Sequence, residues 1–168
     1  FKGKLYNQDI LIEMLGLHLC TFNGVKEEEA KETSPEIIII KLYKKYGLDY
    51  TLQVLDGQFI FILFDYYYMN SISKVYIVRD IFGLYPLYMQ TYNNTYIFSG
   101  HVHPSTEGVI PVKPGTYVTF ELSSKICAEW THSGSTTYYT LPKSLFMNEK
   151  SSNILYKNLL INCIEKII

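Results

Sequence analysis

The chain has 168 residues, a length that fits one domain, and 48% of them are apolar, which is enough to close a core without disulfides or metals. Its 15 lysines and arginines against 16 aspartates and glutamates give a formal charge of -1, which leaves no basic footprint for nucleic acid. The aliphatic run 37–40 is far shorter than the roughly 20 residues that cross a bilayer, so no membrane partner is expected.

The first and last elements are both predicted to be helices. Asn7 is expected to cap a short amphipathic helix over 8–18, its side-chain oxygen accepting a backbone amide of the first turn. The pattern over 152–168 predicts a final helix that reaches the chain end without a stop signal. Because the chain also opens on Phe1 instead of Met, we expect a polypeptide cut at both ends.

A second helix is predicted from a start signal and a stop signal. Ser34, Pro35 and Glu36 stand in the order of a cap, a first helical residue and an acid that matches the helix dipole. Gly47 is expected to end this helix.

The middle of the chain is predicted to be rich in strands, since 16 Tyr and 9 Phe favour pleated surfaces. From Gln58 to Phe64 both faces are apolar, which predicts a central strand buried between two layers. Further strands are predicted over 73–79, 84–90, 95–99, 116–122 and 125–130, followed by a polar stretch over 131–150. The short spacing predicts consecutive hairpins in an antiparallel meander.

Two long motifs identify a family. Residues 55–65 read LDGQFIFILFD and residues 79–88 read RDIFGLYPLY. In this order they resemble the LDGxFAFxxxD and RDxxGxxPLY signatures of the glutaminase domains of asparagine synthetases. Segments 1–7 and 36–47 are similar to the FNGEIYN segment and the EVILHLYEKYG helix of that family, and 97–100, 112–117 and 139–142 resemble later segments.

The resemblance implies an α+β fold of the N-terminal-nucleophile hydrolase type, with two stacked antiparallel sheets flanked by helices (αββα) and truncated at the N-terminal side. It implies a glutamine amidotransferase type 2 domain over 1–145 and a linking helix over 146–168 toward a missing ATP-dependent synthetase domain. Physical chemistry assigns the motif residues to the architecture first, because glycines suit positive φ, aspartates accept turn amides and proline suits a strand start. These residues are Asp56, Gly57, Arg79, Asp80, Gly83 and Pro86.

The resemblance also implies a leading cysteine whose thiolate attacks the glutamine carboxamide while its own α-amine shuttles the proton. Phe1 has no nucleophilic side-chain atom, and Cys20 lies mid-chain, so no catalytic residue is expected in these residues. The glutamine-binding positions of the family fall on Lys2, Gly3, Lys4 and Ser34, in place of Asn, Gly, Glu and Asp. Lys4 would repel the substrate ammonium, and Ser34 offers a hydroxyl in place of a charge. An alignment slipped by one residue near Ser34 is the alternative.

Three functions stay open. The chain is an excerpt of an asparagine synthetase that hydrolyses glutamine to supply ammonia for ATP-dependent amidation of aspartate, or a degenerate relative with a regulatory or docking role, or a standalone binding domain. The expected partners are glutamine, if the domain is active, and the synthetase domain of the same parent chain, with a homodimer left open.

No cofactor is expected in this chain, since ATP and Mg belong to the missing synthetase domain. His101 and His103 have no third ligand nearby, so no metal is expected. Cys20, Cys127 and Cys163 are in no metal-ligand or redox spacing, which predicts free thiols and a cytoplasmic location.

Overall fold

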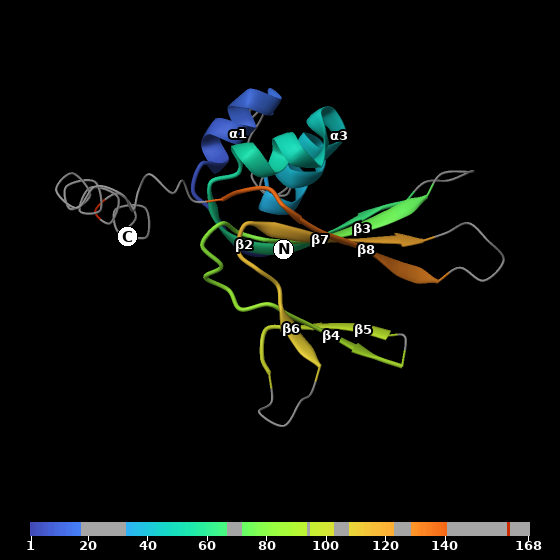
Figure 1. The fold of residues 1–168 in the computed structure, drawn as a ribbon. Coiled ribbons are helices and arrows are strands. Elements are labelled where there is room, and N and C mark those ends of the chain that lie inside the picture. Colours follow the sequence, from blue (N-terminus) through green and yellow to red (C-terminus); the bar gives the residue numbers. More distant parts are fainter. Residues whose placement is uncertain are drawn as a thin grey trace.

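The computed structural model describes residues 1–17, 33–66, 72–93, 95–102, 108–122, 129–140 and 161 (Figure 1). These residues form a mixed α+β fold with two antiparallel sheets, of strand order β1-β2-β3-β7-β8 and β5-β4-β6. The elements in chain order are β1 (Lys2–Leu5), α1 (Gln8–Leu15), α3 (Pro35–Val54), β2 (Gly57–Asp65), β3 (Ser73–Arg79), β4 (Tyr88–Tyr92), β5 (Thr95–Ser99), β6 (Val109–Pro111), β7 (Thr116–Leu122) and β8 (Trp130–Thr137).

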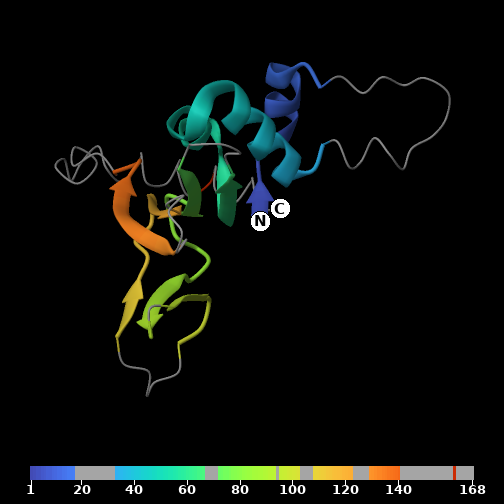
Figure 2. The same ribbon diagram turned by 90° about the vertical axis from the view of Figure 1, so that its right-hand side faces the viewer.

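The described elements form three layers. Helices α1 and α3 lie side by side on one face of the five-stranded sheet, and the three-stranded sheet lies on its other side (Figures 1 and 2). One core packs between helices and sheet, and includes the buried side chains of Leu11, Ile38, Leu42, Phe59 and Phe61. A second core packs between the two sheets, and includes Val75, Ile77, Leu87, Val118 and Phe120. The outer helix layer of the expected αββα arrangement is not among the described residues.

Strand β2 is an inner strand of its sheet, between β1 and β3, in line with the predicted central strand, but only one of its faces is buried along its length. Phe59, Phe61 and Leu63 face the helices and are buried. On the other face Ile62 and Phe64 are 48% and 54% exposed, so the prediction of burial on both sides is wrong at this end of the strand. The reason is that the three-stranded sheet packs against β3 and β7 instead.

Both predicted helices of the first 54 residues exist with different ends. Asn7 precedes α1, but its side chain makes no capping bond; it donates to the Val54 carbonyl at 2.8 Å and accepts from the Asp56 amide at 3.1 Å. Gly47 does not end α3. Its φ of 81° and ψ of 174° make a kink, after which buried Leu48 and Leu52 hold a second helical segment against the core.

The strand predictions over 73–79, 95–99 and 116–122 match β3, β5 and β7. The strand predicted over 84–90 begins only at Tyr88. The expected meander is also wrong, because β4 leaves for the second sheet and β7 takes the place beside β3. Strand β8 occupies 130–137, and all of it after Trp130 lies in the stretch predicted to be a polar connection, because it pairs as a polar edge strand with β7.

Some predictions lie outside the described residues. These are the final helix over 152–168, apart from helical Ile161, together with residues 125–128, Cys20, Cys127, Cys163 and His103. Within the described part of the chain, neither helix has the length and apolar character that crossing a membrane requires.

Candidate functional site

Strand β1 carries three of the four residues to which the resemblance assigns glutamine binding. It pairs antiparallel with β2, so that Lys2 faces Ile60, Gly3 faces Phe59 and Lys4 faces Gln58. In the described part of the chain this strand forms an edge of the five-stranded sheet. The three residues are therefore held in a fixed register by backbone hydrogen bonds.

Gly3 sits where no other residue fits. Its φ is +138°, a conformation that is nearly exclusive to glycine, and a Cβ built on it would lie 2.0 Å from the Gln58 carbonyl oxygen. Gly57 on the facing strand has the same constraint, because its Cβ would lie 2.3 Å from the Lys4 carbonyl oxygen. The two glycines let the backbones of β1 and β2 approach closely, and this approach determines the position of the Gly3 backbone.

The side chains of Lys2 and Lys4 leave β1 on the same face, since strand residues two apart share a face. This is the face opposite the helices, because Leu5 points into the helix-side core. The Lys2 ammonium lies 5.3 Å from the centre of the Tyr85 ring, and the Lys4 ammonium lies 5.9 Å from that of Tyr6. Nothing in the sequence spacing indicated these two ring partners. The face presents two positive charges at positions where the resemblance predicts an amide and a carboxylate.

Ser34 lies on the helix side, at the start of α3. Its backbone is extended, with φ -64° and ψ 148°, and its side chain makes no capping hydrogen bond. The start of α3 is tied to α1 by the Gln8 side chain, which donates to the Thr33 carbonyl at 2.6 Å. Within the described residues, no hydrogen bond or ring contact joins Ser34 to Lys2 or Lys4.

The chain start and the first turns of α3 nevertheless share one cavity of about 440 Å³. Phe1, Glu36, Ile39 and Ile40 line it, together with the end of β2 from Phe61 to Asp65. The Phe1 ring stacks on Phe59, with centroids 6.4 Å apart. Phe1 therefore places an aromatic ring beside this cavity, and its side chain offers no nucleophile.

Arg79 organises the loop that follows β3. Its guanidinium donates to three backbone carbonyls, those of Gly83 at 2.7 Å, Tyr85 at 2.9 Å and Val112 at 2.5 Å. Because the Gly83 and Tyr85 carbonyls are engaged by Arg79, they do not pair in a strand, which explains why β4 starts later than predicted. Pro86 lies in this irregular stretch, two residues before β4.

Asp80 stabilises the same loop from its buried side. It is fully buried, and its Oδ1 accepts the amides of Phe82 and Gly83, each at 2.8 Å. Gly83 has a φ of +64°, and a Cβ there would lie 2.6 Å from the Pro114 ring. Asp56 contributes through its backbone, which accepts the Tyr6 amide at 2.7 Å and so joins the end of β1 to the start of β2.

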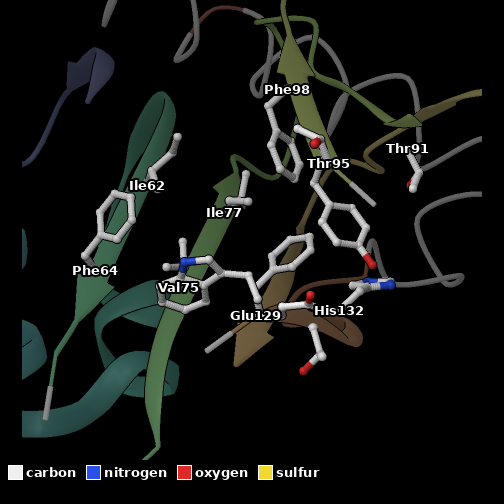
Figure 3. Close-up of a pocket in the computed structure, with 13 residues that line it drawn as sticks. Ile62, Phe64, Val75, Ile77, Thr91, Thr95, Phe98, Glu129 and His132 are labelled. Atoms are coloured by element: carbon white, nitrogen blue, oxygen red, sulfur yellow. The ribbon is translucent and has the colours of Figure 1, made fainter. Parts of the chain in front are cut away.

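A larger cavity lies elsewhere, between the two sheets. It measures about 730 Å³ and contains none of the residues predicted for glutamine binding. Figure 3 shows Ile62 and Phe64 of β2 on one side of it, and Phe98 on the other. Its walls are mainly apolar, with Tyr96, Glu129 and His132 as its ionisable lining residues. No cysteine lines it, and we place the candidate site at β1 instead.

Comparison with known proteins gives a family model and several relatives. The model described as a glutamine amidotransferase domain matches residues 1–118. A glutamine-hydrolysing asparagine synthetase of Gallus gallus is 26% identical over 186 aligned positions, which cover 94% of this chain and 30% of that protein. That of Mesocricetus auratus is 33% identical over 88 positions, covering 52% and 13%, and that of Pongo abelii is 41% identical over 51, covering 30% and 8%. The chain thus spans 30% or less of the length of these relatives.

Proposed function

This chain belongs to the glutamine amidotransferase domain family, and we propose that it is the glutaminase domain of an asparagine synthetase, whose role is to hydrolyse glutamine and supply ammonia for amidation of aspartate. The observation that carries this proposal is the family match over residues 1–118, which begins within the candidate site and runs through both long motifs. Similarity to an asparagine synthetase across 94% of the chain supports the same assignment.

We propose further that the fold is of the N-terminal-nucleophile type. A helix layer and two antiparallel sheets with a core between them support this. In such a fold a leading cysteine attacks the carboxamide, ammonia leaves, and water releases glutamate from the thioester. The Gly3 amide would donate to the oxyanion, a contact typically worth about 2.7 to 4 kcal/mol. The close packing of Gly3 on β2 would hold that donor in place before substrate arrives.

The 168 residues by themselves are proposed to be inactive. Phe1 supplies an α-amine and a ring, and thioester formation needs a thiolate on the same residue as the amine. ATP and Mg would act in a synthetase domain and have no role at β1.

A degenerate domain with a docking or regulatory role is the second candidate. The observation that favours it is the charge on β1, where Lys2 and Lys4 present two ammonium groups on one face. A free glutamine carries its own ammonium, and like charges at close range in a partly desolvated site repel. Ser34 adds no compensating carboxylate.

A chimera tests the proposed function. The chain is joined behind the N-terminal segment of a glutamine-hydrolysing asparagine synthetase, so that a cysteine leads the polypeptide. We expect this chimera to release glutamate from glutamine, whereas the 168-residue chain and the chimera with Cys→Ala release none. A coupled glutamate assay measures the rates.

A folded chimera without cysteine-dependent glutamate release would refute the glutaminase assignment and leave the docking role. Far-ultraviolet circular dichroism and thermal melting establish that each protein is folded. Turnover by the unextended chain would also contradict the proposal, because it would require a nucleophile other than a leading cysteine.

A further inference from the structure

A polar cavity lies under α3, on the helix side of the five-stranded sheet. It contains none of the residues to which glutamine binding was assigned. It measures about 540 Å³, within the range of small-molecule sites. Helix α3 contributes Tyr43, Lys44, Gly47, Leu48 and Asp49, and the strands contribute Asp65, Tyr76 and Tyr117. We call it the tyrosine–aspartate cavity. Apart from Gly47 and Leu48, every residue that lines it has a polar side chain.

The strand register explains why three polar side chains from three strands meet under the helix. Tyr76 of β3 pairs with Leu63 of β2, which faces the helix-side core, so Tyr76 faces the helices too. Tyr117 of β7 pairs with Val78, which is buried in the same core. Asp65 lies two residues beyond Leu63 and so shares its face. The sequence alone gave no sign of this meeting, because it depends on β7 lying next to β3.

The cavity has a carboxylate at each end of a row of three tyrosines. Asp65 accepts the Tyr43 hydroxyl, and the Tyr43 ring centre lies 6.1 Å from that of Tyr76. Tyr76 lies in turn 6.0 Å from Tyr117, edge to face, and the Tyr117 hydroxyl donates to Asp49 at 3.3 Å. Two negative groups are therefore separated by aromatic surface.

Hydrogen bonds within the cavity leave several of its oxygens free to accept from a ligand. Tyr43 and Tyr117 donate their hydroxyl hydrogens to Asp65 and Asp49, so these two phenol oxygens and the two carboxylates can only accept further bonds, while Lys44 and the Tyr76 hydroxyl are the donors in the lining. Burial, followed by the hydrogen bond to Asp65, raises the pKa of Tyr43, and burial raises the pKa of Tyr117. Both phenols therefore stay neutral at physiological pH.

Nearby cations leave the charge of these two aspartates incompletely balanced. Lys44 lines the cavity, so the cavity residues carry two negative charges and one positive charge. Lys74 lies opposite Asp65 in the strand register, but its ammonium pairs with Glu121 at 3.1 Å. Among the described residues, no ion pair within 4.0 Å joins Asp49 or Asp65 to a cationic side chain.

The chemistry favours an organic cation over a metal ion. Calcium takes six to eight oxygen ligands and magnesium needs an octahedral set, whereas this cavity offers two separated carboxylates. No group of three metal-ligating side chains occurs in the described part of the chain. Aromatic rings attract ammonium groups electrostatically and pack against alkyl chains, so a carboxylate–ring–carboxylate order fits two ammonium groups joined by hydrocarbon.

We propose that the tyrosine–aspartate cavity binds a linear aliphatic diamine, with one ammonium at Asp65, the other at Asp49, and the alkyl chain along Tyr43, Tyr76 and Tyr117. The site is separate from Lys2, Gly3 and Lys4, whose side chains or backbone serve the strand edge. Diamine binding therefore does not depend on glutamine hydrolysis, and either proposal can fail without the other.

Isothermal titration calorimetry of the 168-residue chain with 1,5-diaminopentane at low ionic strength tests the proposal. We expect saturable binding with one site. Asp49→Asn and Asp65→Asn should each weaken it about tenfold, the factor that corresponds to about 1.4 kcal/mol. Pentylamine, which has one ammonium, should bind about tenfold more weakly than the diamine.

Asp9→Asn is the matched control, because it removes one carboxylate from α1, outside the cavity, and should leave the affinity unchanged. Thermal melting shows whether Asp65→Asn still folds; if it does not, Asp49→Asn decides, because Asp49 is exposed on α3. Absence of saturable diamine binding, equal effects of Asp9→Asn and Asp49→Asn, or competition by Mg²⁺ for the same site would overturn the proposal.

Discussion

Gly3 and Gly134 have nearly the same φ angle in different surroundings. Their φ angles are +138° and +141°, but a Cβ on Gly3 would meet the Gln58 carbonyl at 2.0 Å, while a Cβ on Gly134 would meet nothing within 4 Å. Gly134→Ala therefore measures conformational strain alone, which typically costs about 1 to 3 kcal/mol. Gly3→Ala adds a backbone clash, and we expect a loss of about 4 kcal/mol or more in the free energy of unfolding.

Urea unfolding followed by circular dichroism compares the two variants. Equal losses would mean that the close approach of β1 to β2 does not constrain Gly3. The position was predictable in part, since the resemblance indicated a glycine with a backbone role. The clash was not predictable, because it depends on the register of β1 against β2.

Lys2 and Lys4 carry the clearest prediction about substrate. In the cysteine-led chimera, Lys2→Asn with Lys4→Glu replaces two positive charges by an amide donor and a carboxylate. We expect kcat/KM for glutamine to rise about tenfold or more, since a favourable charge contact replaces a repulsive one. Lys113→Glu with Lys45→Asn makes the same change of net charge away from β1 and should leave kcat/KM unchanged. A rise in this control, or none in the test variant, would place the binding pocket elsewhere.

Arg79 belongs to a motif that the sequence identified, but its three hydrogen bonds are seen only in the structure. Its planar fork reaches three carbonyls, and a lysine ammonium on a flexible stem does not reproduce that geometry. We expect Arg79→Lys to lower the free energy of unfolding by about 2 to 3 kcal/mol, because carbonyls in a part-buried loop lose charged donors. Chemical denaturation measures this, and a loss within experimental error would show that solvent replaces the guanidinium.

Single elements were predictable where local pattern decides the outcome. Strands β3, β5 and β7 have the predicted limits because alternating side chains and turn residues specify them locally. The wrong predictions of single elements have causes in the tertiary structure. Gly47 kinks α3 because the next segment has its own buried leucines, and β8 is a strand because β7 offers a free edge to a polar sequence.

The segment after β8 is hydrogen-bonded to the end of β3 through Tyr138, and this contact predicts how the free energy of unfolding depends on pH. Tyr138 donates its hydroxyl to the Arg79 carbonyl at 2.9 Å, and burial, followed by the charge of Asp80, raises the pKa of Tyr138. A raised folded-state pKa means that the folded chain keeps a proton that the unfolded chain loses above about pH 10. Stability from this group is therefore complete below pH 10 and falls as the pH rises further.

Tyr138→Phe should flatten that alkaline decline relative to the wild type, at the cost of one hydrogen bond at neutral pH, about 1 kcal/mol. Unfolding measured from pH 8 to pH 11 tests this. Tyr92→Phe, at an exposed position, is the control and should keep the wild-type slope. Parallel slopes for wild type and Tyr138→Phe would contradict the account.

At the scale of the whole molecule, the sequence predicted two antiparallel sheets through the resemblance but not their connection. Local spacing favours a meander, whereas the chain crosses from β3 to a second sheet and returns as β7. Local patterns do not encode such a crossover, because it depends on which faces find partners. The tyrosine–aspartate cavity and the cavity between the sheets are products of this topology, because each is lined by residues of β3 and β7.

We have proposed that the chain forms a glutaminase scaffold that needs a leading cysteine for its chemistry. Intact-mass spectrometry after treatment with a thiol-directed glutamine analogue tests it most directly. We expect one adduct on the leading cysteine of the chimera, suppressed by excess glutamine, and no adduct at the N-terminus of the 168-residue chain. A folded chimera that is not labelled at its cysteine, or a glutamine-protected adduct on the unextended chain, would contradict the claim.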